Sequence, residues 1–436
     1  MTTQSPSAAA LAMPPLIKRN IVLFTLSQSF NGAGMQLAYG MGPLMVLALT
    51  SSAALAGLSV AVIGLSRFLV AYPVGKVMDA YGRKPAILLG LVLALFGALA
   101  LSLSIETRSL LLLTTGMLIF AMGMNAAQQL RVAATDMVLP HRRGQALGYV
   151  ALGSLAGLVF FPPMMRFSEA YAASFGLHEL GLPWLLIPLL ILPGMVLVKL
   201  VRPDPKEIGM NLSRYYPGYV APPHEHDAAG PAAFSWSDAV RPLPIRLAIA
   251  CNCAAQGNMA VIMVLTSLVL HKHGHSLSAI AFSHMFHSAG MFAFTIPLGW
   301  LSDRIGRARV MYPGVAVTMV GAALVVFPQA YWFVTLGTFL VGLGWAAANV
   351  AATAYIADHS ETSRRGRTIG INDTAAGAIA VLMAVLTGPL IGLGGLAAAG
   401  IMAMTVSLLP ALLIPAVLSD RRAAHVRQPA GALEED

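Results

Sequence analysis

The chain has 436 residues, of which 57% are hydrophobic and only 10% charged, and its mean hydropathy is +0.74. A soluble domain carries about 25% charged residues, so this composition excludes a soluble enzyme and indicates a membrane protein with many spans. The net charge of +9 does not indicate a nucleic-acid partner, because the basic residues stand at segment ends and form no basic stripe interleaved with aromatic residues.

The N-terminal stretch, residues 1–19, is rich in Ala, Ser and Pro and ends at Lys18 and Arg19. Because no small-residue cleavage site follows a short apolar run, we expect a disordered tail before an uncleaved first span. A polar, Pro-rich stretch at 202–243 is the expected linker between two halves, and 419–436 is the expected C-terminal tail.

Two long apolar regions, 20–201 and 244–418, lie on either side of the linker. A helix needs roughly 20 mainly apolar residues to cross the hydrocarbon core, and each region holds six such segments. We therefore predict an all-α membrane protein with 12 transmembrane helices in two six-helix bundles. The segments are expected to begin near Ile21, Ala54, Pro85, Leu110, Gly144, Leu182, Ile245, Ser278, Val310, Tyr331, Thr368 and Leu396.

The basic residues predict the orientation. If both termini are cytoplasmic, most of the 27 Lys and Arg residues fall on the cytoplasmic side, as the positive-inside rule requires. Only Arg108, Arg166 and Lys272 then face outward, while Arg67 and Arg131 lie within spans. The two intramembrane arginines are expected to form ion pairs or to act in gating.

The two halves repeat each other. The loop after the second span reads GKVMDAYGRK (75–84), and the loop after the eighth reads GWLSDRIGR (299–307). Asp136 and Asp358 are each followed, at the same spacing, by Arg-Arg-Gly, and both pairs of patterns lie at nearly one offset. A six-span unit repeated in parallel is typical of secondary transporters.

The GxxxDxxGRK loop and its copy resemble the signature loops of the major facilitator superfamily, and the resemblance extends from about Lys18 to Leu418. It implies two pseudo-symmetric six-helix bundles that rock about a central substrate. We expect the charged loop residues to stabilise one conformation and gate the cytoplasmic side rather than to bind substrate. These residues are Asp79, Arg83, Asp136, Asp303, Arg307 and Asp358.

Soft metal ligands stand at helical spacing in the seventh and eighth spans. Met259 and Met263 are four apart, as are His287 and Met291, so each pair lies on one helix face. Thioethers select Cu(I) and imidazole also suits copper. Both pairs fall between the midplane and the outer half of the membrane. The alternative is packing, because methionine readily fills gaps between helices and a buried histidine can hydrogen-bond across them.

Within the superfamily, MxxxM in the seventh span and HxxxM in the eighth resemble the CcoA-type copper importers. Those proteins supply copper for assembly of a haem–copper cytochrome oxidase in bacteria. The resemblance implies that Met259, Met263, His287 and Met291 bind copper in a bacterial inner membrane protein. Copper is then the substrate, no cofactor is expected, and a cytoplasmic copper chaperone is a candidate partner. We expect a monomer embedded in the bilayer, with no nucleic-acid partner.

Further candidates for a copper relay flank this site. Thiols near the cytoplasmic end of the seventh span could receive Cu(I), and a histidine-rich outer turn could collect it, although buried cysteines are often inert and such turns are often only solvated. A histidine three residues before His287 shares its face. These relay candidates are Cys251, Cys253, His271, His273, His275 and His284, and Asp373 is the candidate for proton coupling.

Three other functions stay open at this point. An organic-solute carrier, for riboflavin or a drug, would have a wide cavity lined by aromatic residues and by Asn31, Gln36, Asn125 and Gln128. A passive scaffold or sensor would bind metal without transport. An enzyme is least favoured, because the sequence has no P-loop, HExxH motif or nucleophile elbow. The fifth span lacks the Gly-Pro signature of drug-efflux members, which favours uptake.

Overall fold

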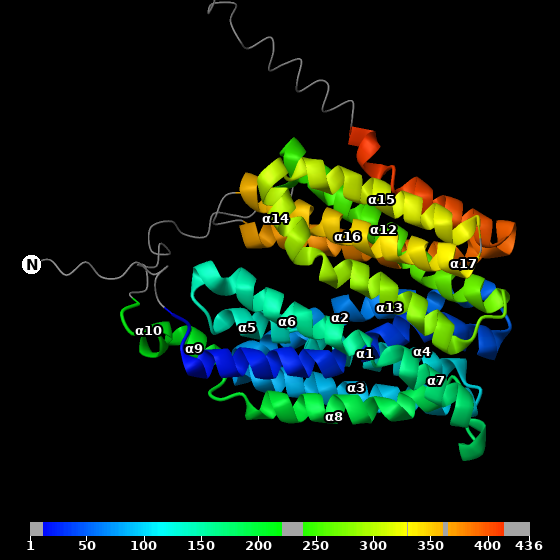
Figure 1. Cartoon of the computed structure of the whole chain (residues 1–436), viewed down its shortest axis with the longest axis horizontal. Coiled ribbons are helices and arrows are strands. Elements are labelled where there is room, and N and C mark those ends of the chain that lie inside the picture. The colour runs from blue at the N-terminus through cyan, green and yellow to red at the C-terminus, as the bar shows by residue number, and fades with distance from the viewer. Residues whose placement is uncertain (1–11, 220–238, 329, 361–364, 414–436) are drawn as a thin grey trace, which may run out of the picture.

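The computed structural model describes residues 12–219, 239–328, 330–360 and 365–413. Every regular element in these ranges is a helix, and no strand occurs among them. Two bundles of long helices lie side by side, one formed by the N-terminal half and the other by the C-terminal half (Figure 1).

Several of the expected spans consist of two shorter helices separated by a break. The N-terminal bundle contains α1 (Pro15–Thr50), α2 (Gly57–Tyr81), α3 (Arg83–Glu106), α4 (Leu110–Ala127), α5 (Leu130–Asp136), α6 (Arg143–Leu158), α7 (Phe161–Tyr171) and α8 (Leu182–Leu200). The C-terminal bundle contains α12 (Leu243–Lys272), α13 (Leu277–Ala293), α14 (Thr295–Ile305), α15 (Ala308–Val326), α16 (Tyr331–His359) and α17 (Arg365–Val406).

The described helices agree with twelve spans. Ten of them are long and apolar enough to cross a membrane, counting α4 with α5 and α6 with α7, and the pair α13 and α14, bent by 42°, makes an eleventh. The last helix, α17, is broken at Gly394 and Gly395, so it supplies two spans. Gly395 has a φ of 69°, which favours glycine, and the twelfth span begins directly after it.

The N-terminal boundary differs from the prediction. Helix α1 begins at Pro15, before the expected start of the first span, so part of the predicted tail is helical. Proline is favoured at the first helical position because its amide nitrogen carries no hydrogen to leave unpaired, and the next turn buries Ile17. The rest of that tail (1–11) and the predicted tail at 419–436 lie outside the described residues.

The start of the predicted linker is folded against the N-terminal half. It forms α9 (Pro205–Met210) and α10 (Leu212–Tyr215). The carboxylate of Asp204 accepts hydrogen bonds from the backbone N–H groups of Arg83, at 3.0 Å, and Lys84, at 2.9 Å, and so caps α3. The hydroxyl of Tyr216 donates to the carbonyl of Met137, and burial raises the pKa of Tyr216 to about 12.

The first helix is the least hydrophobic of the ten spans and one of the most enclosed. It packs against α6, α8 and α12, so it contacts both halves. Polar side chains such as Asn20, Gln28 and Asn31 are buried along it. Only α12 is more enclosed, because its whole apolar window is buried inside the protein. These two helices form the centre of the molecule.

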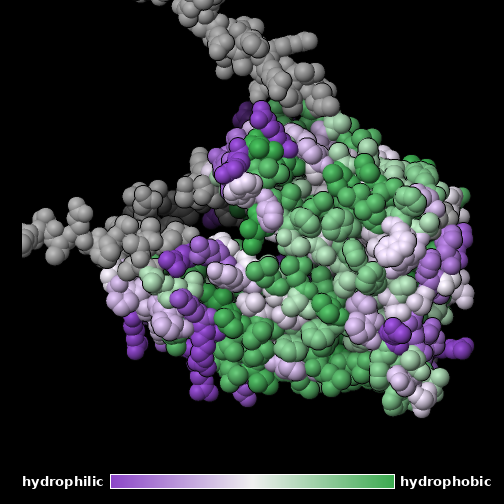
Figure 2. Space-filling model, viewed as in Figure 1, coloured by the Kyte–Doolittle hydropathy of each residue, from purple (hydrophilic) through white to green (hydrophobic). Residues whose placement is uncertain are grey.

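The halves meet at one end and separate at the other. We call the end that carries the loops at Gly82 and Gly306 the signature end, and the opposite end the distal end. At the distal end, Gly57 of α2 lies against the carbonyl of Ala384 in α17, and Gly388 of α17 lies against that of Ala54. At the signature end a hollow separates the two halves (Figure 2). The structure is therefore a conformation open toward the signature end.

Candidate functional site

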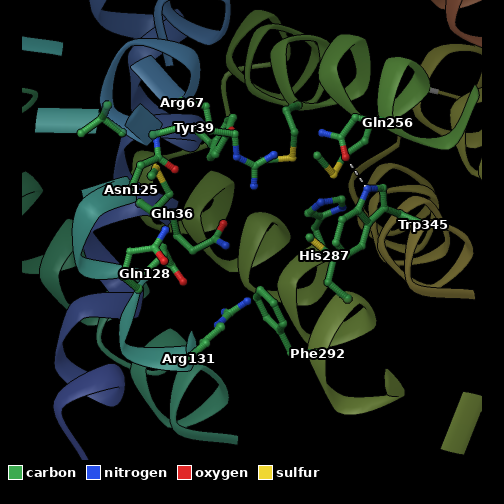
Figure 3. Close-up of a pocket in the computed structure, with 17 residues that line it drawn as sticks. Gln36, Tyr39, Arg67, Asn125, Gln128, Arg131, Gln256, His287, Phe292 and Trp345 are labelled. Carbon is green, nitrogen blue, oxygen red and sulfur yellow. Dashed lines mark hydrogen bonds between the residues drawn. The ribbon is translucent and has the colours of Figure 1, made fainter. Parts of the chain in front are cut away.

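A cavity of about 320 Å³ lies between the two halves. Figure 3 shows its 17 lining residues, which come from α1, α2, α4, α5, α12, α13 and α16 and from the turn between α4 and α5. They are Met35, Gln36, Tyr39, Arg67, Val70, Ala71, Asn125, Gln128, Gln129, Arg131, Gln256, Met259, Met263, His287, Met291, Phe292 and Trp345.

The four predicted copper ligands lie together in this cavity, two from α12 and two from α13. Met35 of α1 is a fifth soft donor on the lining, and it was not predicted from the sequence. Its neighbour at helical spacing is Tyr39, not a second methionine, so no ligand motif marked it. Only its place in the first span could have drawn attention to it. Sulfur atoms lie beside His287 in the close-up (Figure 3).

The ring of His287 is fixed by the neighbouring helix α16. Its Nδ1 lies 2.9 Å from the carbonyl oxygen of Thr338, and because a carbonyl only accepts, Nδ1 carries the proton and donates. In the neutral ring the Nε2 lone pair is then available as an acceptor or metal ligand. A histidine that donates its other N–H to a backbone carbonyl is the usual arrangement for a metal ligand.

The wall opposite His287 is polar and cationic (Figure 3). Of the amides expected in an organic-solute site, Gln36, Asn125 and Gln128 line the cavity, whereas Asn31 does not and donates to Ser27 at 3.2 Å. The Oε1 atoms of Gln36 and Gln128 are buried and have no hydrogen-bond partner in the described protein.

The predicted relay residues lie apart from the cavity. Cys251 and Cys253 are buried free thiols, and neither is among its lining residues. Cys251 packs in a cluster with Ala248 and Met311. The relay through these thiols is not supported by their placement and stays a prediction.

The histidine-rich turn also lies away from the cavity, at the end of α12, and His271 belongs to the last turn of that helix. His271 and His273 are exposed, and His273 Nδ1 is bonded to the carbonyl of Val269 at 2.7 Å. The ring of His275 packs on Tyr331, with ring centroids 5.1 Å apart. The predicted capture of copper by this turn is untested.

His284 supports a hydrogen bond between the two halves and does not line the cavity. The Ser267 hydroxyl donates to the carbonyl of Gly40 at 2.7 Å, so it crosses from α12 to α1. Because its one proton is used there, this hydroxyl accepts from His284 Nε2, at 2.8 Å. The chain of bonds helps to close the distal end, a role that the sequence did not indicate.

The predicted gating residues form two similar clusters, one in each half. Arg83 bonds Asp136 at 2.7 Å and Asp79 at 3.2 Å. In the other half Arg307 bonds Asp358 at 3.1 Å and also pairs with Asp303. Each arginine thus joins the aspartate four residues before it to the aspartate of the second repeated motif. The gating role itself stays a prediction.

The cluster in the C-terminal half offers a test of that role. Burial lowers the pKa of Arg307, but the bonds to Asp303 and Asp358 outweigh burial and raise it above its usual value. Arg307 makes two partly exposed ion pairs, each contributing up to about 1 kcal/mol, so we expect Arg307→Gln to slow transport by no more than about 30-fold. Substrate binding should be unchanged, as measured by equilibrium binding beside uptake. The exposed Arg309→Gln is the matched control, and an unchanged uptake rate in Arg307→Gln would contradict the gating role.

Asp373, the candidate for proton coupling, lies beside the main cavity. It lines an adjoining space together with Arg67, Gln256 and Trp345, all three of which also line the main cavity. Its Oδ1 accepts a hydrogen bond from Asn372 at 3.1 Å. A carboxylate at this place can interact with the charge of Arg67, and its coupling role is untested.

A family model described as the Major Facilitator Superfamily matches residues 24–242 and 247–434. The chain belongs to the major facilitator superfamily. It is therefore a multi-pass inner membrane transporter and not an enzyme, and the predicted fold class is confirmed.

Relatives in this superfamily align over most of the chain. The uncharacterised MFS-type transporter YdeG of Bacillus subtilis is 28% identical over 413 residues, which is 93% of each chain. The riboflavin transporter RfnT of Brucella anthropi is 25% identical over 364 residues, 82% of this chain and 85% of the relative.

Solved structures of the superfamily share the fold. The nucleoside transporter NupG matches with a TM-score of 0.63 at 13% identity, over 93% of this chain and 98% of its own. The D-xylose–proton symporter also gives 0.63, at 12% identity, over 90% and 97%. None of these four matched proteins is named as a copper transporter. The comparisons therefore support membership of the superfamily but do not support the copper-importer subtype.

Proposed function

We propose that this transporter imports copper by alternating access, with the ion bound in the central cavity. The observation that carries the proposal is the gathering of soft donors there. Met259, Met263, His287 and Met291 were expected from two separate motifs, and all four line one cavity together with Met35. Thioether and imidazole ligands favour Cu(I), whereas hard cations prefer oxygen.

The fixed ring of His287 adds support. Its hydrogen bond to Thr338 sets the tautomer in which Nε2 can bind a metal. The methionines Met259 and Met263 are almost fully buried, at 7% and 2% exposed, so packing against neighbouring helices holds their thioether groups in place. A site between two halves near the centre of the membrane is where secondary transporters bind their substrates.

The proposal includes an orientation and a destination. With both termini in the cytoplasm, the signature end faces the cytoplasm and the structure is the inward-open state. Copper released there would pass to a cytoplasmic chaperone and serve the assembly of a cytochrome oxidase. A single chain encloses the whole cavity, which is consistent with a monomer.

The second candidate is a carrier of a small organic solute such as riboflavin. It is favoured by the amide-rich wall, where the Oε1 atoms of Gln36 and Gln128 are unpartnered, and by the 25% identity to a riboflavin transporter. A flat, polar ring system would use the hydrogen-bonding atoms and could stack on Trp345 or Tyr39.

Uptake into proteoliposomes distinguishes the candidates. The purified full chain is tested with ⁶⁴Cu(I) and, in parallel, with labelled riboflavin. We expect protein-dependent accumulation of copper and none of riboflavin. Riboflavin uptake without copper uptake would select the organic-solute carrier. Copper binding without accumulation would indicate a sensor or scaffold.

A further inference from the structure

We propose that the copper enters this cavity as an anionic complex, with the metal on the thioether–imidazole wall and the anionic ligand on Arg67 and Arg131. The inference rests on the proposed copper transport and names the form in which the cargo is bound. It follows from the positive charge of the cavity lining, which repels a bare cation.

Two guanidinium groups line the cavity, Arg67 from α2 and Arg131 from α5. Within the described ranges neither has a carboxylate oxygen within 4.0 Å, whereas Arg83 and Arg307 each have two acidic partners. The two charges are close enough to interact with each other. An ionised side chain inside the membrane is costly and is retained where it faces a partner or a water-filled cavity.

Only some of the guanidinium donors of Arg131 have hydrogen-bond partners among the described residues. One guanidinium nitrogen donates to Ser154 at 3.3 Å, and the group lies over the ring of Phe292, 5.5 Å from its centroid. Its Nε atom is buried and has no hydrogen-bond partner among the described residues. Figure 3 places Arg131 and Phe292 at the same side of the cavity, facing each other from the two halves. An unpaired guanidinium N–H in such a place is a ready donor to an anion.

Arg67 reaches toward the copper-binding wall. In Figure 3 it extends across the cavity from the side of Tyr39 toward Gln256. The acidic residue Asp373 lines an adjoining space together with Arg67 and is close enough to interact with its charge. The lining of the main cavity itself contains two arginines and no acidic residue.

This arrangement matches a complex and not a lone ion. A bare Cu(I) ion would be attracted by five soft donors but repelled by two fixed positive charges. A small complex with net negative charge satisfies both walls, since guanidinium groups bind oxyanions while the sulfur and nitrogen donors complete the coordination of the metal.

Removing a positive charge should raise the KM for an anionic copper complex but not for a copper cation, and the test measures this difference. Full-length wild type, Arg131→Gln, Arg67→Gln and the charge-preserving Arg131→Lys are compared in proteoliposomes. Two copper sources are used: the thiosulfate complex of Cu(I), labelled with ⁶⁴Cu and ³⁵S, and the acetonitrile-stabilised Cu(I) cation. Membrane abundance is measured for each variant.

For the thiosulfate complex we expect wild type to accumulate ³⁵S together with ⁶⁴Cu. Each Gln variant should raise the KM about tenfold, as the loss of one charge interaction in a partly hydrated site predicts, and Arg131→Lys should stay near wild type. For the cation, the same Gln variants should leave the KM unchanged or lower it.

Other results overturn the inference. A bare-cation substrate would give a lower KM in both Gln variants with either source, and ⁶⁴Cu would enter without ³⁵S. An equal KM for the thiosulfate complex in wild type and both Gln variants would show that the arginines do not bind the cargo. A wild type that takes up neither source would instead refute copper transport itself, so the two failures are distinguishable.

Discussion

Replacing Met263 by Leu or His287 by Gln should remove most copper uptake while the protein stays folded and abundant in the membrane. Met→Leu conserves volume and costs less than about 1.5 kcal/mol in packing, but it removes the thioether. His287→Gln can keep a hydrogen bond to the carbonyl of Thr338 but loses the imidazole ligand. Since even the hydrogen-bond partners of metal ligands are worth about 10–100-fold in metal affinity, each variant should lose at least about tenfold. The measurement is the initial rate of ⁶⁴Cu uptake per molecule of protein.

The first helix supplies the matched control. Met41 and Met45 form an MxxxM pair there, but both are fully buried in the core and neither lines the cavity. The indole N–H of Trp184 donates to the sulfur of Met45 at 3.1 Å, so Met41 is the cleaner choice. Met41→Leu should transport at the rate of the wild type. If Met263→Leu and His287→Gln also do so at normal abundance, the copper site proposed here does not exist.

Adding one methyl group at Gly388 should abolish transport by preventing closure of the distal end. A Cβ atom at Gly388 would lie 1.9 Å from the backbone oxygen of Ala54 in the other half, far inside any possible contact. Alanine is the better helix former, so α17 itself should not suffer. We expect Gly388→Ala to shift the population toward a state open at the distal end. Copper should still bind from that side but should not accumulate.

Gly392 provides the comparison, because it lies one turn further along the same helix. A Cβ atom there would be 3.9 Å from the side chain of Ala54, an ordinary contact. Gly392→Ala should therefore transport normally. Spin-label distances between the first turn of α2 and the break in α17 at Gly394 measure directly whether the distal end is open or closed. A Gly388→Ala protein with the same distances and uptake as wild type would show that this contact is not needed for the transport cycle.

Most of the architecture could be predicted from the sequence, because helix length and apolar content are local properties. The predicted start near Leu396 coincides with the break at Gly394 and Gly395, where a glycine-rich sequence ends one span and begins the next. The start at Pro15 does not follow from the Ala-, Ser- and Pro-rich composition of residues 1–19, because it depends on the burial of Ile17 in the core. The folding of α9 and α10 onto the first half depends on contacts of Asp204 with distant residues, which no local pattern reveals.

The candidate site was predictable where its residues occur in pairs. Helical spacing placed Met259 with Met263 and His287 with Met291, and all four lie in one cavity. Met35 stands alone in its helix, so only the packing of α1 against α12 brings it to the others.

For the relay residues, position in the sequence did not predict a place in the cavity. Cys251 is close to the copper ligands in sequence, but it lies on a different face of α12 and packs away from the cavity. His284, although three residues before His287, contacts Ser267 rather than the cavity. Sequence spacing gives the face of a helix, but it does not say which neighbour covers that face.

The enclosed position of α1 has a consequence for how the protein is made. This helix is made before the other described helices, yet it is the least hydrophobic of the ten spans and carries buried polar groups such as Asn20 and Gln28. Its tendency to enter lipid alone is therefore the weakest of these ten spans. Of its partners in the finished fold, α2 follows directly, whereas α6, α8 and α12 are synthesised much later. We expect α1 to stay beside the insertion machinery until these later helices arrive, so that chains truncated before α6 are degraded rather than stably inserted.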